Sequence, residues 1–211
     1  MVEDVKASFL PADKWTVAAF VLAQRRQIDR VLWRGRLSLG GSQGIELSLH
    51  LGFVLTIFTV TWLLAVALLP NLFPGWEPRL YWLVGVSVAL TDSFAGLAHE
   101  LGHAVVAVAR GRRVYHISLH GLLAAARRSS GPARPRDQFA IALAGPVSHL
   151  LVACTLLCAW RFLPIENEPL RVAMGFPAVS NFAAGVLNLL PVSPLDGGRV
   201  TRAVVAWLFG V

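Results

Sequence analysis

The chain has 211 residues, of which 55% are hydrophobic and 15% are charged, and its formal net charge is +7. Soluble domains carry about 25% charged residues, and uncharged runs of roughly 20 residues are long enough to cross a bilayer. The composition therefore excludes an ordinary soluble protein. Positive charge can indicate nucleic acid binding, but here the arginines cluster between apolar runs without interleaved aromatic residues, so we expect no nucleic acid partner.

Residues 1–45 are the most polar part of the chain, and we expect them to form a cytosolic or interfacial segment ahead of a core over residues 46–211. Apolar residues recur in this segment at helical spacing, at Val17, Val21, Ile28 and Leu32. This pattern fits equally well a basic amphipathic helix on the membrane surface and a cytosolic helix packed on the core. A turn or linker is then predicted at Gly40, Gly41, Ser42 and Gly44.

Four apolar segments follow, and each is predicted to be a membrane-spanning helix. They cover about 49–69, then Leu80 through residue 103, about 138–160, and Val172 to Pro191. The arginine-rich loop between the second and third segments contains an alternating pattern at 112–127 that indicates a short β-element. The predicted fold class is an all-α polytopic membrane protein with about four transmembrane helices and this one β-element.

Basic residues concentrate in the N-terminal segment, in the loop over 110–136, and at Arg199 and Arg202. With four spans, all of these regions fall on one side of the membrane, and basic loops are typical of the cytoplasmic side. We therefore expect a multi-pass protein of the cell membrane whose N-terminus is cytoplasmic. The arginine-rich, lysine-poor composition further indicates a bacterial origin.

The second span ends in His99-Glu100-Leu101-Gly102-His103, an H-E-x-x-H motif. Residues four apart lie on one face of a helix, so His99 and His103 are placed to hold one metal ion. Glu100 is then beside the ion, where a general base for water is needed. Ionisable residues at membrane depth also indicate a functional site. This end of the helix is the one predicted to face the cytoplasm.

A catalytic zinc ion takes three protein ligands and leaves a fourth position for water. Asp196, His149, Asp92 and the two histidines of the β-element are candidates for the third ligand. Asp92 lies roughly 10 Å along the helix from His99, which is too far to bind the same ion. Asp92 is better placed to line a water cavity or to contact a metal ligand. The two β-element histidines would be about 13 Å apart and cannot share an ion. Asp196 is favoured, because it lies between prolines and glycines, where broken backbone would expose its carboxylate.

Three motifs in order now resemble a known family. These are the H-E-x-x-H motif, Ala144-Gly145-Pro146 in the third span, and Asn188-Leu-Leu-Pro-Val-Ser-Pro-Leu-Asp196-Gly-Gly after the fourth. Over roughly residues 46–202 the chain resembles the site-2 protease family of intramembrane zinc metalloproteases. The resemblance implies one catalytic Zn²⁺ held by residues matching His99, His103 and Asp196. It also implies that Glu100 activates water and that Asn188 acts near the metal.

The resemblance further implies hydrolysis of peptide bonds within or near a transmembrane helix of a membrane-protein substrate in the lipid bilayer, as in regulated intramembrane proteolysis. Where the family often has an asparagine, this chain has His149. We treat His149, Asp92 and Asn181 as candidates for contact with substrate or with the metal ligands. The alternative function is a catalytically silent membrane protein of the same fold that binds client helices or metal. A metal transporter would need more ionisable residues along its spans.

Overall fold

The computed structural model describes residues 36–42, 45–112, 114–120, 123–128 and 134–210. The helix expected around residues 17–32 lies outside these ranges. Residues Leu37–Val211 form one compact unit, and the description that follows concerns this unit.

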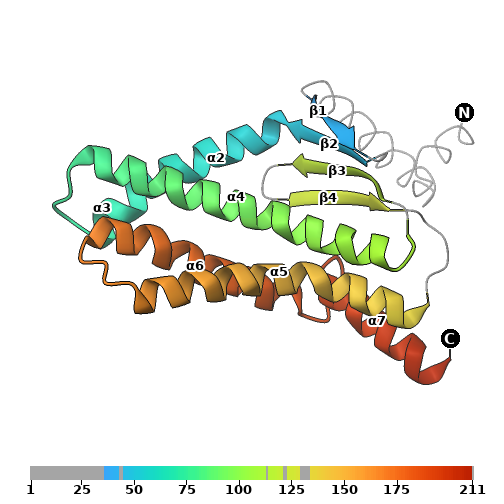
Figure 1. Cartoon of the computed structure of the whole chain (residues 1–211). Coiled ribbons are helices and arrows are strands. Elements are labelled where there is room, and N and C mark those ends of the chain that lie inside the picture. Colours follow the sequence, from blue (N-terminus) through green and yellow to red (C-terminus); the bar gives the residue numbers. More distant parts are fainter. Residues whose placement is uncertain (1–35, 43–44, 113, 121–122, 129–133, 211) are drawn as a thin grey trace, which may run out of the picture. The chain divides into compact units, whose positions relative to one another are not determined.

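Four helical segments are long and apolar enough to cross a membrane, which confirms the predicted polytopic all-α class. The first comprises α2 (Leu51–Leu63), the π-helical turn η2 (Leu64–Leu68) and α3 (Leu69–Leu72). The others are α4 (Pro78–Ala109), α5 (Pro135–Phe162) and α6 (Glu168–Asn188), and the shorter α7 (Asp196–Phe209) follows them. Helices α4, α5 and α6 run side by side, with α7 packed against α5 (Figure 1).

The predicted β-element is part of a four-stranded sheet with the order β1-β2-β3-β4. Strands β3 (Val114–His120) and β4 (Leu123–Arg128) form an antiparallel pair within the predicted β-element, and β2 (Ile45–His50) runs parallel to β3. β1 (Arg36–Ser42) completes the sheet, so Gly40, Gly41 and Ser42 lie within a strand, while Gly44 lies outside the described residues. The alternation of apolar and polar residues in β1 and β2 is the signal that the sequence analysis missed.

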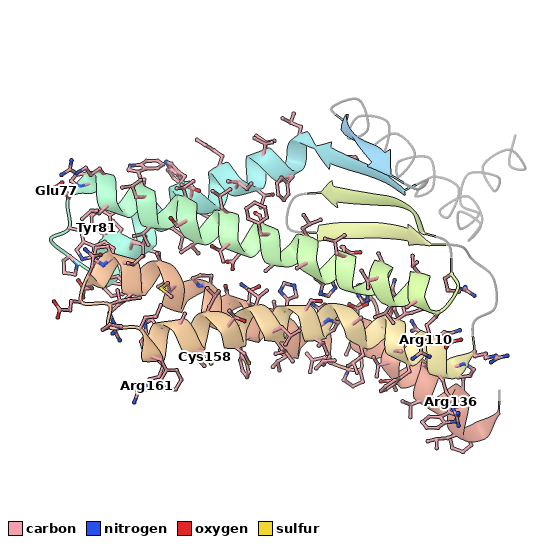
Figure 2. All side chains as sticks on the ribbon, in the orientation of Figure 1. Glu77, Tyr81, Arg110, Arg136, Cys158 and Arg161 are labelled. Carbon is pink, nitrogen blue, oxygen red and sulfur yellow. The ribbon has the colours of Figure 1, made fainter. Side chains whose placement is uncertain are left out.

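One end of the bundle is held together by a cluster of buried apolar side chains, formed by Leu64, Ala65, Leu69, Tyr81, Val84, Val88 and Val172. The Tyr81 hydroxyl donates a hydrogen bond to the Phe73 carbonyl at 2.7 Å. Figure 2 places Tyr81 at the α3 end of α4 and Arg110 at the opposite end. Val88 is the member of this cluster nearest to the motif along α4, and it precedes His99 by 11 residues, or about 16.5 Å along the helix.

The outer surfaces of the spanning helices are apolar. Large hydrophobic side chains such as Phe58, Phe94 and Leu151 are 64–67% exposed. Exposure of this kind is expected where lipid replaces water as the surrounding medium. The polar side chains of the motifs are instead turned inward, toward the contacts of α4 with α5 and α7.

Candidate metal centre

Three donor atoms from α4 and α7 converge on one point. The Nε2 atoms of His99 and His103 are 3.1 Å apart, and Asp196 Oδ2 lies 3.1 Å from the first and 3.0 Å from the second. Zn–N and Zn–O bonds of about 2.0–2.1 Å in a tetrahedral site place the donors roughly 3.3 Å apart. The nearly equilateral triangle therefore fits a zinc ion, and all three residues are buried.

Asp196 reaches the histidines because the chain turns back sharply after α6. A Cβ on Gly197 would collide with the carbonyl of Leu189, and a Cβ on Gly198 would lie 2.9 Å from the carbonyl carbon of Val192. Only glycine permits this close approach of two backbone segments. The predicted break in the helix thus becomes a tight turn, and Asp196 is the first residue of α7.

The ligand side chains are oriented by neighbouring groups. His103 Nδ1 donates a hydrogen bond to the Ile141 carbonyl at 2.6 Å, which leaves Nε2 free to bind the ion. Arg199 donates to Asp196 Oδ1 at 3.0 Å, which leaves Oδ2 free. Burial raises the pKa of the Asp196 carboxyl, but hydrogen bonds and charge from His103 and His99 lower it by more. The net pKa lies well below the usual range, so the Asp196 carboxyl is ionised.

Helix α5 crosses α4 directly over the two ligand histidines at Gly145. A Cβ at this position would lie 2.6 Å from His103 Cε1 and 2.7 Å from His99 Cε1. Real Cβ atoms do not approach other heavy atoms so closely, so a larger residue would displace the imidazoles. The Ala144-Gly145-Pro146 motif therefore has a physical role here, which is to leave room for the ligands.

Gly145→Ala is expected to weaken zinc binding about 10-fold or more, because changes in the surroundings of metal ligands cost about 10–100-fold in affinity. Zinc affinity of the purified protein, measured by competition with a chromophoric chelator, checks this. Gly96→Ala is the matched control, because a Cβ on that α4 glycine meets no atom within 4 Å. Equal zinc affinities of the two variants would show that α5 does not restrict the ligands.

Glu100 is buried beside the ligands on α4. A carboxylate oxygen of Glu100 and nitrogen atoms of His99 and His103 all lie within 4.8 Å of one another. One water molecule can bridge a distance of this size, as a general base acting on water requires. The structure thus places the four predicted residues His99, Glu100, His103 and Asp196 in one cluster, and their chemical roles stay predictions.

The remaining candidates lie differently. Asn188 is the last residue of α6, half-buried, and its side chain makes no hydrogen bond to another residue in the described part of the chain. Asp92, Asn181 and His149 do not join the donor triangle. They form a separate hydrogen-bonded group, and the His149 ring lies against the His99 ring, with centroids 4.9 Å apart. Each of these three residues was predicted individually from the sequence, and their connection was not.

Four membrane-spanning segments around two histidines, an aspartate and an adjacent glutamate define a membrane-embedded site of the metalloprotease type. The Peptidase M50B-like family model matches residues 64–164. The fold is shared with the Site-2 Protease from Methanocaldococcus jannaschii, at a TM-score of 0.56 and 24% identity, over 81% of this chain and 72% of that chain. Together with the motifs, these matches make the chain similar to the Peptidase M50B-like family, and its fold is similar to that of a site-2 protease.

Two of the curated proteins that the chain resembles are named as putative zinc metalloproteases. The chain is 34% identical to the putative zinc metalloprotease Rip3 of Mycobacterium tuberculosis over 173 residues, which is 81% of this chain and 44% of that protein. It is also 34% identical to the putative zinc metalloprotease sll0528 of Synechocystis over 140 residues, 65% of this chain and 36% of that protein. The chain thus spans less than half the length of these relatives.

Proposed function

We propose that the chain is a zinc-dependent intramembrane endopeptidase that hydrolyses peptide bonds within or near a transmembrane helix of a membrane-protein substrate. Three buried donor atoms converge beside Glu100, two of them on a helix long enough to cross a membrane, and this convergence carries the proposal. A catalytically silent binding protein would not need the carboxylate next to a complete set of ligands. The complete site therefore favours the enzyme over the silent alternative.

In the proposed reaction, His99, His103 and Asp196 would hold one zinc ion, which would polarise the substrate carbonyl and make water more acidic. Glu100 removes a proton from the attacking water as its oxygen bonds to the carbonyl carbon. When the C–N bond breaks, Glu100 delivers that proton to the leaving amine nitrogen. Asn188 is proposed to donate a hydrogen bond to the carbonyl oxygen as negative charge develops there.

The substrate segment must be unwound before this chemistry can occur. In a transmembrane helix every peptide carbonyl accepts an internal hydrogen bond and is covered by side chains. Local unwinding exposes the scissile carbonyl to the ion and to Glu100. The lipid bilayer and a spanning protein substrate are therefore the proposed partners, and we propose cleavage of the kind that regulates membrane-anchored proteins.

We propose that the end of the bundle that carries α7 and the sheet faces the cytoplasm of a bacterial cell. The helices and turns at this end carry Arg110, Arg112, Arg134, Arg136, Arg199 and Arg202, with Asp137, and the strands add Arg36, Arg127 and Arg128, with Glu46. Those at the opposite end are Arg79, Arg161 and Arg171, balanced by Glu77, Glu166 and Glu168. An excess of arginine is typical of the cytoplasmic side, and it supports a cytoplasmic N-terminus as well.

Removal of zinc is the direct test of the proposed function. The purified chain in proteoliposomes is expected to cleave a synthetic single-span peptide, to stop after dialysis against a chelator, and to recover fully with one equivalent of Zn²⁺. Mass spectrometry of the fragments should place the cut inside the apolar segment or next to it. Cleavage by the metal-free protein, or a cut far outside the apolar segment, would refute the proposal.

A further inference from the structure

A chain of buried and part-buried hydrogen bonds crosses from α4 through α6 to α5 and ends beside the proposed metal ligands. Asp92 Oδ1 accepts from Asn181 Nδ2 at 2.7 Å and from the Ser180 hydroxyl at 2.8 Å. Asn181 Oδ1 is 2.8 Å from His149 Nδ1. Asn181 is 2% exposed and His149 is 9% exposed. We call Asp92, Asn181 and His149 the relay.

The partners of Asn181 fix which way its amide points. Its Nδ2 lies 2.7 Å from Asp92 Oδ1 and 2.7 Å from the Pro177 carbonyl oxygen. A carbonyl oxygen can only accept, so the NH₂ group must face this side, where both of its hydrogens are used. Asn181 Oδ1 therefore faces His149 and can only accept a hydrogen bond. It follows that His149 Nδ1 carries a hydrogen and donates it.

With the hydrogen on Nδ1, the Nε2 atom of a neutral His149 ring has a bare lone pair. Within the described ranges, Nε2 has no hydrogen-bond partner. The ring lies next to His99, so a free acceptor stands beside the donor triangle. The triangle already supplies the three protein ligands of a catalytic zinc site, which leaves His149 Nε2 available for another group.

We propose that the relay holds His149 in the Nδ1–H form so that Nε2 accepts a hydrogen bond from a backbone N–H of the unwound substrate next to the scissile bond. An apolar membrane span has few side-chain donors, and unwinding leaves its backbone N–H groups without partners. Each such group costs free energy in a water-poor site unless an acceptor is provided. This inference rests on the proposed endopeptidase function and assigns its substrate contact.

The tautomer of His149 is the first test, and its readout is independent of activity. In the zinc-loaded full chain with ¹⁵N-labelled histidine, the His149 signal is identified by its absence in His149→Phe. We expect ¹⁵N shifts of the Nδ1–H form in the wild type and a mixture of both tautomers in Asn181→Leu, which removes the acceptor. An Nε2–H tautomer in the wild type, or the same tautomer in both proteins, would overturn the relay.

The substrate contact is tested with synthetic single-span peptides in which one backbone amide near the cut is replaced by an ester, which removes its N–H. At one position the ester should lower the kcat/KM of the wild type about 3- to 10-fold, which corresponds to the net contribution of one hydrogen bond. The same ester should not change the kcat/KM of His149→Phe. On the all-amide peptide, the kcat/KM of His149→Phe should be lower than that of the wild type by a similar factor. The variant should bind zinc normally.

Two results would overturn the contact without touching the proposed function. Equal ester penalties in the wild type and in His149→Phe at every position would show that Nε2 contacts no substrate N–H. Loss of zinc from a folded His149→Phe would show that His149 acts through the ion instead. By contrast, a wild type that binds zinc and cleaves no membrane peptide would refute the proposed function and, with it, the contact.

Discussion

The Glu100→Gln variant is expected to bind zinc like the wild type and to lose at least about 100-fold in kcat/KM on a single-span peptide. The amide keeps the size of the buried side chain but cannot take a proton from water, and general base catalysis contributes about 10²- to 10⁴-fold. None of the three donors of the triangle is changed, so the ion should remain. Zinc analysis and fragment quantification on the same preparation measure both properties.

Glu166→Gln is the matched control, because this carboxylate is exposed in the loop between α5 and α6. It makes the same chemical change far from the triangle and should retain full cleavage. Unchanged cleavage by Glu100→Gln would exclude Glu100 as the base. Loss of zinc from a folded Glu100→Gln would instead show that the carboxylate is itself a ligand.

Asp196→Asn is expected to lose both zinc and cleavage. The change removes the only negative charge among the three converging donors and the acceptor that both ligand histidines face at 3.0–3.1 Å. Loss of an outer partner of a metal ligand costs about 10–100-fold in metal affinity, so loss of a ligand should cost more than about 100-fold. Competition with a chelator measures the affinity, and near-native circular dichroism would show that the variant is folded.

The control for this change is Asp137→Asn. Asp137 pairs with Arg110 at 2.7 Å on a partly exposed surface, where an ion pair contributes little, so zinc affinity should not change. Full zinc binding by Asp196→Asn would remove Asp196 from the ligand set. His149 would then be the leading candidate for the third ligand, and its assignment to the substrate would fail as well.

The spans and the H-E-x-x-H pair were predictable from the sequence because their signals are local. The length of an apolar run can be counted directly in the sequence, and it predicts whether a helix can cross the membrane. A spacing of four residues brings His99 and His103 to one face of a helix, whatever the rest of the fold is. Asp196 was predictable for a weaker reason. The prolines and glycines around it indicate where backbone breaks, but its distance from the histidines depends on the docking of α7.

The relay and half of the sheet were not predictable in this way. The rotation of α4 relative to α6 decides whether Asp92 contacts Asn181. In the sequence, each of these side chains is an isolated polar residue in an apolar run. The parallel pairing of β2 with β3 joins Glu46 to His116 across the whole first span and α4. No local pattern specifies such a pairing, although the alternation within β1 and β2 was present in the printed sequence.

The order of the ligands along the chain has a consequence for biosynthesis. Asp196 follows His103 by 93 residues, and α5 and α6 lie between them. A nascent chain that has inserted α4 carries Glu100 and two histidines but lacks the negatively charged donor. Only when α7 has docked do all three donors lie together, so the proposed zinc site, and with it the proposed activity, is complete only late in the insertion of the chain.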